Sequence, residues 1–375
     1  MSRIHNFSAG PAALPLEVLQ KAQQELTDFR GCGMSIMEVS HRGPEYIQVD
    51  ASARERMLRL LGIEEGYEVL FLQGGASMQF LMVPYNFLNQ DQTADYIATG
   101  TWSKKAIKEA KAFGKVHISF SSEQDEFTYV PTNDQLNPSG IATYTHYTSN
   151  NTIFGTEFEH EPVCDTPLVC DASSNFLSKP IHAKRHALIY AGAQKNLGPA
   201  GVTIVVIEKD FLSKAKATGV PTLLQYGTHV GEMYNTPPVF CVYMVDLVLE
   251  WIEQHGGLAG MEALNKAKAA LLYQEIDRDA FYQGTAQKNS RSRMNVTFRL
   301  ADPELENVFI KEAETNGLSG LKGHRSVGGM RASIYNACPV ASVEALVQFM
   351  QEFRRTRGWS RIRDRGSGIR DQGSG

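Results

Sequence analysis

Short apolar runs alternate along this chain with longer stretches whose apolar residues recur at helical spacing. The apolar runs predict buried strands over 69–72, 96–98, 116–120, 141–146, 168–170, 187–190 and 202–207. Helical spacing predicts helices over 15–29, 44–61 and 103–113, and another helix that begins near Met78. Repeated alternation of strand and helix favours a mostly parallel mixed sheet flanked by helices. The expected fold class is therefore α/β.

The pattern changes at Gly256-Gly257, which we take as a domain boundary. Before it, residues 239–255 are apolar on nearly every side, as in a helix buried against a sheet or at a subunit interface. After it, helices are expected over 261–276, 305–316 and 342–355, with strands over 294–300 and 330–335. We expect a large domain over 16–257 and a small α+β domain made of 1–15 and 258–358. Residues 359–375 are rich in Arg, Asp, Gly and Ser and predict a disordered tail.

Composition narrows the class of protein. Apolar residues make up 42% and charged residues 21% of the chain, as in a globular enzyme with an ample core. The net charge of −4 gives no reason to expect a nucleic-acid partner, and no apolar run is long enough to span a membrane. The N-terminus lacks the pattern of a signal peptide, and the five cysteines form an odd set without a C-x-x-C pair. We therefore expect a cytoplasmic protein with reduced thiols and no metal.

One lysine and one aspartate follow predicted core strands. Lys195 lies in the glycine-punctuated stretch 191–201 between two of these strands, and Asp171 ends a third. Because burial of an ammonium is costly, the pKa of such a lysine can be lowered, which frees its amine for Schiff-base chemistry. Ligands of open α/β sheets bind beyond the carboxyl ends of the strands. The pair fits a pyridoxal-phosphate site, in which the carboxylate keeps the pyridine nitrogen protonated. A surface turn for Lys195 and a helix cap for Asp171 are the alternatives.

A glycine pair and an indole stand at the start of two predicted helices. The stretch Gly74-Gly75-Ala76-Ser77 lies at a strand-to-helix turn, where backbone N–H groups and the helix dipole favour a phosphate. This signal is weak alone, because any tight turn of this kind uses glycine. Trp102 follows another predicted strand, where its ring can stack on a planar ligand or simply fill the core.

Basic residues gather in two glycine-rich loops. The first contains His41 and Arg42, and the second contains His324 and Arg325, with Arg331 a few residues further on. Arginine binds carboxylate and phosphate groups in a bidentate manner, so these loops favour anion binding over a merely solvated surface. The histidines show no metal-ligand spacing.

Together these motifs resemble the phosphoserine aminotransferases, which are fold-type I pyridoxal-phosphate enzymes of aminotransferase class V. The resemblance covers nearly all of residues 1–358. It rests on the stretches 6–11, 38–43, 74–75, 170–174, 192–196, 234–238, 292–295, 322–325 and 328–336.

The resemblance implies a role for each candidate residue. Lys195 and Asp171 would be the catalytic residues. Lys195 would hold the cofactor covalently, and Asp171 would pair with its pyridine nitrogen. The other cofactor ligands would be Trp102 on the ring, Thr152 on the phenolic oxygen, and Ala76, Ser77 and Gln194 on the phosphate. Asn235 and Thr236 would reach that phosphate from the partner subunit of a homodimer. Arg331 would bind the substrate α-carboxylate, and His41, Arg42, His324 and Arg325 would form a second anion pocket. Some family members carry Gly-Arg where this chain has Ala76-Ser77, so backbone N–H groups and a hydroxyl would contribute more to phosphate binding here.

The implied reaction is a reversible ping-pong transamination in serine biosynthesis. L-glutamate and 3-phosphohydroxypyruvate would give 2-oxoglutarate and O-phospho-L-serine. One alternative is a related aminotransferase, such as a serine–glyoxylate transaminase, which has no need for the second anion pocket. Another is a non-catalytic protein that binds a phosphate ligand.

Overall fold

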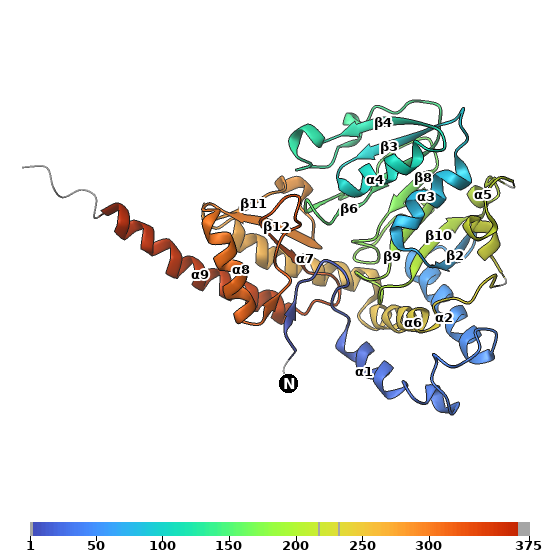
Figure 1. Cartoon of the computed structure of the whole chain (residues 1–375), viewed down its shortest axis with the longest axis horizontal. Helices are drawn as coiled ribbons and strands as arrows, with labels where there is room; N and C mark the ends of the chain where they lie inside the picture. Colours follow the sequence, from blue (N-terminus) through green and yellow to red (C-terminus); the bar gives the residue numbers. More distant parts are fainter. Residues whose placement is uncertain (1–2, 217, 232, 367–375) are drawn as a thin grey trace, which may run out of the picture.

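A seven-stranded sheet forms the larger part of the molecule (Figure 1). The computed structural model describes residues 3–216, 218–231 and 233–366. The sheet has the order β2-β10-β9-β8-β5-β3-β4, in which β10 pairs antiparallel with β2 and β9 and the other neighbours are parallel. Its strands are β2 (Tyr67–Leu72), β3 (Thr93–Ala98), β4 (Lys115–Ser121), β5 (Ala142–Thr148), β8 (Leu168–Asp171), β9 (His186–Gly192) and β10 (Thr203–Glu208). The predicted mostly parallel mixed sheet is confirmed.

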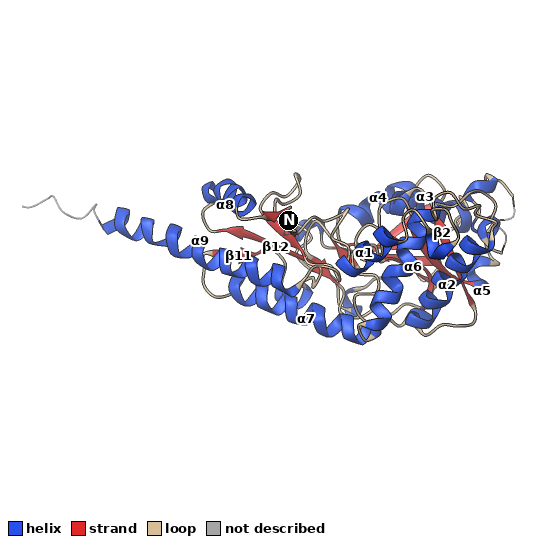
Figure 2. Ribbon diagram, turned by 90° about the horizontal axis from the view of Figure 1, so that it is seen from below, coloured by secondary structure: helices blue, strands red, loops and turns tan. Residues whose placement is uncertain are grey.

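Helices cover both faces of this sheet, as Figure 2 shows. In β10, Ile204 and Val206 pack in the same apolar cluster as α2 (Pro44–Leu61) and α6 (Val239–Gln254). Val205 and Ile207 pack on the other side with α3 (Gly75–Phe87) and α4 (Thr101–Ala110). Because alternate side chains of β9 and β10 are buried on opposite faces, these two strands contain continuous apolar runs in the sequence. The apolar helix expected over 239–255 is α6, which packs against the sheet.

The C-terminal part contains a smaller sheet and a third apolar cluster. Its antiparallel strands are β11 (Tyr282–Gly284), β12 (Asn295–Leu300) and β14 (Met330–Ser333), and its helices are α7 (Gly257–Ile276), α8 (Glu304–Thr315) and α9 (Val340–Gly366). Strand β1 (His5–Asn6) pairs in parallel with β13 (Leu318–Ser319), and Phe7 is buried in this cluster. The N-terminal segment therefore lies on the C-terminal part. The division at residue 257 into two domains stays a prediction.

Two helix ends differ from the predicted ones. Helix α1 (Leu16–Gln24) stops before residue 29, and in the turn that follows the Asp28 carboxylate accepts a hydrogen bond of 2.7 Å from the Gly33 amide. Helix α9 continues to Gly366 and so includes the first part of the tail that was predicted over 359–375. The rest of that tail, 367–375, lies outside the described residues. The short elements of the described residues are β6 (Asn150–Asn151), β7 (Thr156–Glu157), α5 (Lys209–Leu212) and the 3₁₀ turns Phe29–Gly31, Glu123–Asp125, Asn133–Gln135, Ala183–Arg185, Thr222–Leu224, Tyr226–His229 and Lys288–Ser290. Across the described ranges, every helix is too short or too polar to cross a membrane.

Candidate active site

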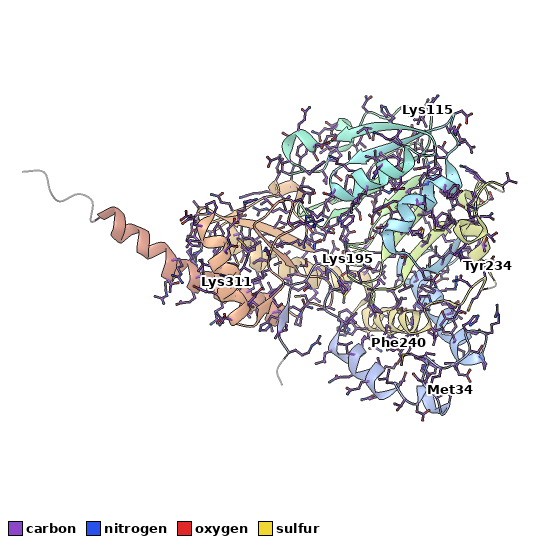
Figure 3. The ribbon with its side chains drawn as sticks, in the orientation of Figure 1. Met34, Lys115, Lys195, Tyr234, Phe240 and Lys311 are labelled. Atoms are coloured by element: carbon purple, nitrogen blue, oxygen red, sulfur yellow. The ribbon has the colours of Figure 1, made fainter. Side chains whose placement is uncertain are left out.

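Two neighbouring parallel strands deliver the lysine and the aspartate to one edge of the large sheet. Asp171 is the last residue of β8 and pairs in register with Tyr190 of β9. Strand β9 ends two residues later at Gly192, and the turn that leads to β10 carries Lys195 (Figure 3). Parallel strands end at the same edge, so the sheet itself brings the two side chains into one region.

Two hydroxyl groups hold the Lys195 amine. Its Nζ donates a hydrogen bond of 2.9 Å to Thr152 Oγ1 and one of 2.7 Å to Ser174 Oγ. The two hydroxyls also hydrogen-bond each other. Burial lowers the pKa of Lys195 to about 8; the Asp171 charge raises this pKa in part and the Arg331 charge lowers it further. A neutral, nucleophilic amine is therefore accessible near neutral pH.

The Asp171 carboxylate is buried and oriented by Ser173. Its Oδ1 accepts hydrogen bonds from the Ser173 amide at 3.0 Å and from the Ser173 hydroxyl at 2.7 Å. Burial raises the pKa of Asp171, while the Lys195 charge and the Ser173 hydrogen bonds lower it in part. Among the described residues no donor bonds Oδ2, which leaves this oxygen for a protonated ring nitrogen.

An indole and a guanidinium stand beside the amine. The centroid of the Trp102 ring, in the first turn of α4, lies 5.9 Å from the Nζ of Lys195. Arg331 on β14 donates a hydrogen bond of 3.2 Å from Nη1 to the Thr152 carbonyl. Within the described structure, the buried Trp102 Nε1 and Arg331 Nε atoms have no hydrogen-bond partner. Such atoms are costly to bury alone, so they fit a site that binds a polar ligand.

The N-terminus of α3 has the geometry of a phosphate cradle. Gly74 and Gly75 adopt positive φ values of 90° and 65°, which glycine accepts without strain. These conformations turn the chain from β2 into α3, whose first turn contains Ala76 and the exposed Ser77. The free N–H groups of this first turn are therefore available to an anion.

The N-terminal segment closes over the lysine turn. The Ala12 amide donates a hydrogen bond of 2.9 Å to the Gln194 carbonyl. A Cβ atom on Gly10 would lie 3.3 Å from the Cγ of Lys195 and 3.5 Å from the Cγ of Gln194. The sequence motif 6–11 is thus explained by a close approach of backbone to the lysine stem.

Among the described residues, no hydrogen bond or ion pair joins the two basic loops. His324 lies in the loop before β14, where its Nδ1 is 2.7 Å from Ser326 Oγ. Burial lowers the pKa of His324, and nearby charges that include those of Arg331 and Arg325 lower it further. Arg42, next to His41, lies instead near the Met233 carbonyl at 3.5 Å. The structure therefore places His324, Arg325 and Arg331 together and leaves the first basic loop elsewhere.

Asn235 and Thr236 also lie away from Lys195. The Asn235 side chain donates a hydrogen bond of 3.3 Å to the Gln73 side chain, which in turn donates one of 3.2 Å to the Thr236 carbonyl. Figure 3 shows Tyr234, the neighbour of Asn235, well apart from Lys195. Asn235 and Thr236 thus share the region of Arg42 and Met233.

Sequence reasoning assigned no role to three residues at this site. Ser174 accepts from Lys195, Ser173 orients Asp171, and Gly10 lies against the lysine stem. The serines lie two and three residues after Asp171, in the stretch 170–174 on which the resemblance rests, and this stretch was the available signal. Hydrophobic periodicity does not predict the contacts of a single serine, so these contacts are seen only in the folded chain.

The residues present fit pyridoxal phosphate. Lys195, with its lowered pKa, suits the aldehyde of this cofactor. The buried Asp171 carboxylate has one oxygen free for the ring nitrogen, and the N-terminus of α3 suits the phosphate. Trp102 Nε1 and Arg331 Nε, which have no hydrogen-bond partner among the described residues, are free to donate to a bound ligand.

The fold and this lysine–aspartate site define a class-V aminotransferase. The model of the family described as aminotransferase class-V matches residues 4–346. Phosphoserine aminotransferase of Geobacillus kaustophilus is 52% identical over 358 residues, which are 95% of this chain and 99% of that protein. The chain belongs to the phosphoserine aminotransferase family.

Solved structures agree with this assignment. The phosphoserine aminotransferase from Bacillus circulans subsp. alkalophilus has a TM-score of 0.93 at 52% identity, covering 95% of this chain and 99% of that chain. The phosphoserine aminotransferase from Trichomonas vaginalis, solved with PLP bound, has a TM-score of 0.88 at 42% identity, covering 93% of this chain and 100% of that chain.

Proposed function

We propose that this protein transfers the amino group of L-glutamate to 3-phosphohydroxypyruvate, giving O-phospho-L-serine and 2-oxoglutarate, with pyridoxal phosphate as cofactor. One observation carries the proposal. Thr152 accepts a hydrogen bond from Lys195 through its hydroxyl and one from Arg331 through its carbonyl. A reactive amine and a carboxylate-binding guanidinium therefore share one residue as their anchor, as transamination of an α-amino acid requires.

Each residue of the site has a task in this reaction. Bound pyridoxal phosphate supplies an electron sink for the bond to the substrate Cα. Asp171 keeps the ring nitrogen protonated, and the α3 N-terminus with Ser77 and Gln194 binds the phosphate. Arg331 binds the substrate α-carboxylate in a fork. With the cofactor bound, the Lys195 amine would take up and return the proton at the substrate Cα.

His324 and Arg325 form half of the second anion pocket, and His41 and Arg42 of a partner subunit complete it. Two observations support a homodimer. The first basic loop lies beside Met233, next to Asn235 and Thr236, so both groups belong to one surface. Large apolar side chains are exposed in these same segments, with Met37 at 56%, Ile47 at 49% and Tyr234 at 56%. A dimer that buries them would bring both groups to the partner's site.

The reaction is tested with the purified holoenzyme and a substrate panel. We expect glutamate-dependent turnover of 3-phosphohydroxypyruvate that exceeds turnover of the unphosphorylated 2-oxo acid by several orders of magnitude. Lys195→Ala should abolish multiple turnovers, whereas Lys311→Ala, an exposed lysine of α8, should not. Equal turnover of phosphorylated and plain substrates would favour a related aminotransferase. A protein that takes up no cofactor would favour the non-catalytic alternative.

The shared site is tested by mixing two inactive variants. Lys195→Ala lacks the amine, and Arg42→Ala lacks an anion ligand that we assign to the neighbouring subunit. If the assignment holds, a mixed dimer contains one site with both defects and one intact site, so activity returns after co-refolding. A mixture that stays inactive, although mixed dimers form, would place Arg42 and Lys195 in the same site of the same chain.

The proposed cytoplasmic location is supported by the cysteines. All five are free thiols in the structure, which supports a reducing, cytoplasmic environment.

A further inference from the structure

A second lysine lies against Trp102. Lys105 is exposed and stands one turn along α4 from Thr101, on the same face of the helix. Its Nζ lies 4.5 Å from the centroid of the Trp102 ring, in a cation–π contact. The indole that is expected to stack on the cofactor therefore also fixes a cation at the rim of the site.

The loop of the second anion pocket faces this part of α4. Thr101 on one side and Gly323, Ser326 and Arg331 on the other line the same cavity of about 740 Å³. The charge of Lys105 also reaches the loop between them: after burial and the two arginines, it is a further cause that lowers the pKa of His324. Lys105 thus adds to the positive field at the position where His324 and Arg325 stand.

The neighbouring lysine differs in its charge balance. Lys104 forms an ion pair with Glu123. Within the described part of the chain, Lys105 has no carboxylate partner, so its charge is not neutralised by the protein. An uncompensated cation next to other cations destabilises the free site and is favourable only when an anion arrives.

We propose that Lys105 is a further anion-binding residue of the site and favours the phosphorylated substrate over glutamate. This inference rests on the proposed function. Both substrates would place a side-chain anion near His324 and Arg325. A phosphate carries nearly two negative charges at neutral pH, whereas the glutamate side chain carries one. The same cation therefore attracts the phosphorylated substrate more strongly.

The test compares Lys105→Met with Lys104→Met in the holoenzyme. Both variants lose one exposed positive charge on the same helix and keep a long aliphatic side chain. Lys105→Met should raise the KM for 3-phosphohydroxypyruvate by about fivefold, which is the upper end of the range for one exposed charge pair. The KM for glutamate should rise by about threefold or less, and kcat should stay within about twofold, since the charge acts on binding. Lys105→Arg should restore the KM for the phosphorylated substrate, and Lys104→Met should resemble the parent protein.

A binding measurement separates this inference from the function on which it rests. Inorganic phosphate is titrated into each holoenzyme by calorimetry at low and at physiological salt. Its Kd should weaken about fivefold in Lys105→Met at low salt and less at high salt, because salt screens an exposed charge. The inference is wrong if both lysine variants keep the parent KM values and phosphate Kd. It is also wrong if Lys105→Met changes both substrates equally and shifts the cofactor absorbance, which would indicate an effect through Trp102. If the parent enzyme does not turn over the phosphorylated substrate, the proposed function fails, and the phosphate titration still decides the role of Lys105.

Discussion

The hydroxyl of Ser174 accepts a hydrogen bond of 2.7 Å from the Nζ of Lys195. Ser174 follows the end of β8, so the strand that ends in Asp171 also supplies an acceptor for the reactive amine. The two influences on the amine are opposed. Burial favours its neutral form and lowers the pKa of Lys195 to about 8, whereas hydroxyl acceptors and the Asp171 charge favour the ammonium. The balance leaves the amine able to change charge near the pH of the cell.

The first prediction concerns the pH dependence of this amine in the apoprotein. Because the pKa of Lys195 is lowered to about 8, the reactive neutral form should increase as pH rises through 8. The rate of pyridoxal-phosphate uptake should follow the same curve, with a midpoint near pH 8. Stopped-flow absorbance measures uptake, and amine labelling with peptide mapping assigns the midpoint to residue 195. A midpoint near 10.5, the ordinary value for lysine, would contradict the structure.

The second prediction concerns Ser174→Ala. Loss of an acceptor destabilises the ammonium more than the neutral amine, so the midpoint of cofactor uptake should move to lower pH. The amine also loses one of its two orienting contacts, and turnover should fall by about tenfold. Ser213→Ala, which removes an exposed hydroxyl bonded to the Asp210 carbonyl, serves as the control and should change neither quantity. An upward shift of the midpoint would show that Ser174 does not act as an acceptor.

The third prediction concerns the carboxylate. Asp171→Asn keeps the shape and removes the charge that favours a protonated ring nitrogen, so kcat should fall by about a hundredfold or more. The Asp171 charge also raises the pKa of Lys195, and its removal should therefore move the uptake midpoint below 8. Ser173→Ala removes a donor to Asp171 Oδ1 together with the acceptor of the Gly192 amide, and it should raise the pKa of Asp171 with a smaller loss of kcat. The test is the kcat of the two variants measured side by side. A larger loss of kcat in Ser173→Ala than in Asp171→Asn would contradict the prediction.

The sequence predicted the scaffold of the site better than its contacts. Strands β8, β9 and β10 are continuous apolar runs, because both faces of the sheet are covered, and this pattern placed Asp171 and Lys195 after strand ends. Strand β1 was not predicted, since His5–Asn6 is too short to show any alternation. Its pairing with β13 depends on residues more than three hundred positions away.

The two basic loops show a different limit. Their residue types indicated anion binding, but a sequence motif does not show where in the fold, or next to which subunit, the loop will lie. Only the fold shows that His324 stands beside Arg331, whereas Arg42 lies beside Met233. The same limit explains why Lys105 had no assigned role, because its neighbour Lys104 has the same residue type and a different environment.

The fourth prediction concerns Gly10. At φ 134° an added Cβ would meet the Lys195 stem at 3.3 Å, so Gly10→Ala should displace the lysine and lower kcat by about tenfold or more. Gly140→Ala is the matched control, since Gly140 also has a positive φ of 74° but no atom within 4 Å of its added Cβ. Both variants should lose thermal stability because both conformations disfavour alanine. Only Gly10→Ala should lose activity, and equal activity in the two variants would exclude a contact with the lysine.

The last prediction concerns a buried cation behind the site. Lys268 of α7 is fully buried and donates hydrogen bonds to the carbonyls of Ile334, Tyr335, Asn336 and Cys338 at 3.1, 2.6, 3.4 and 3.2 Å. This segment follows β14, and the Asn336 amide donates to the Asn196 side chain at 3.0 Å, next to Lys195. The ammonium therefore fixes the segment that joins the small sheet to the lysine turn.

Lys268→Met keeps the length of the side chain and leaves these carbonyls without their donor. Unpaired buried acceptors cost about 3 kcal/mol in total, which corresponds to a Tm lower by about 4 °C in a chain of this size. Lys266→Met on the same helix removes an exposed ion pair with Glu262 and should lower Tm by less than about 2 °C.

Burial lowers the pKa of Lys268 to about 8 from 10.5 in the unfolded chain, so between these values the unfolded chain binds more protons. The stability that Lys268 contributes should therefore increase as pH rises from 8 to 10. Thermal unfolding of both holoenzyme variants across this range decides the point, and a Tm difference between Lys268→Met and the parent protein that narrows with pH would contradict it.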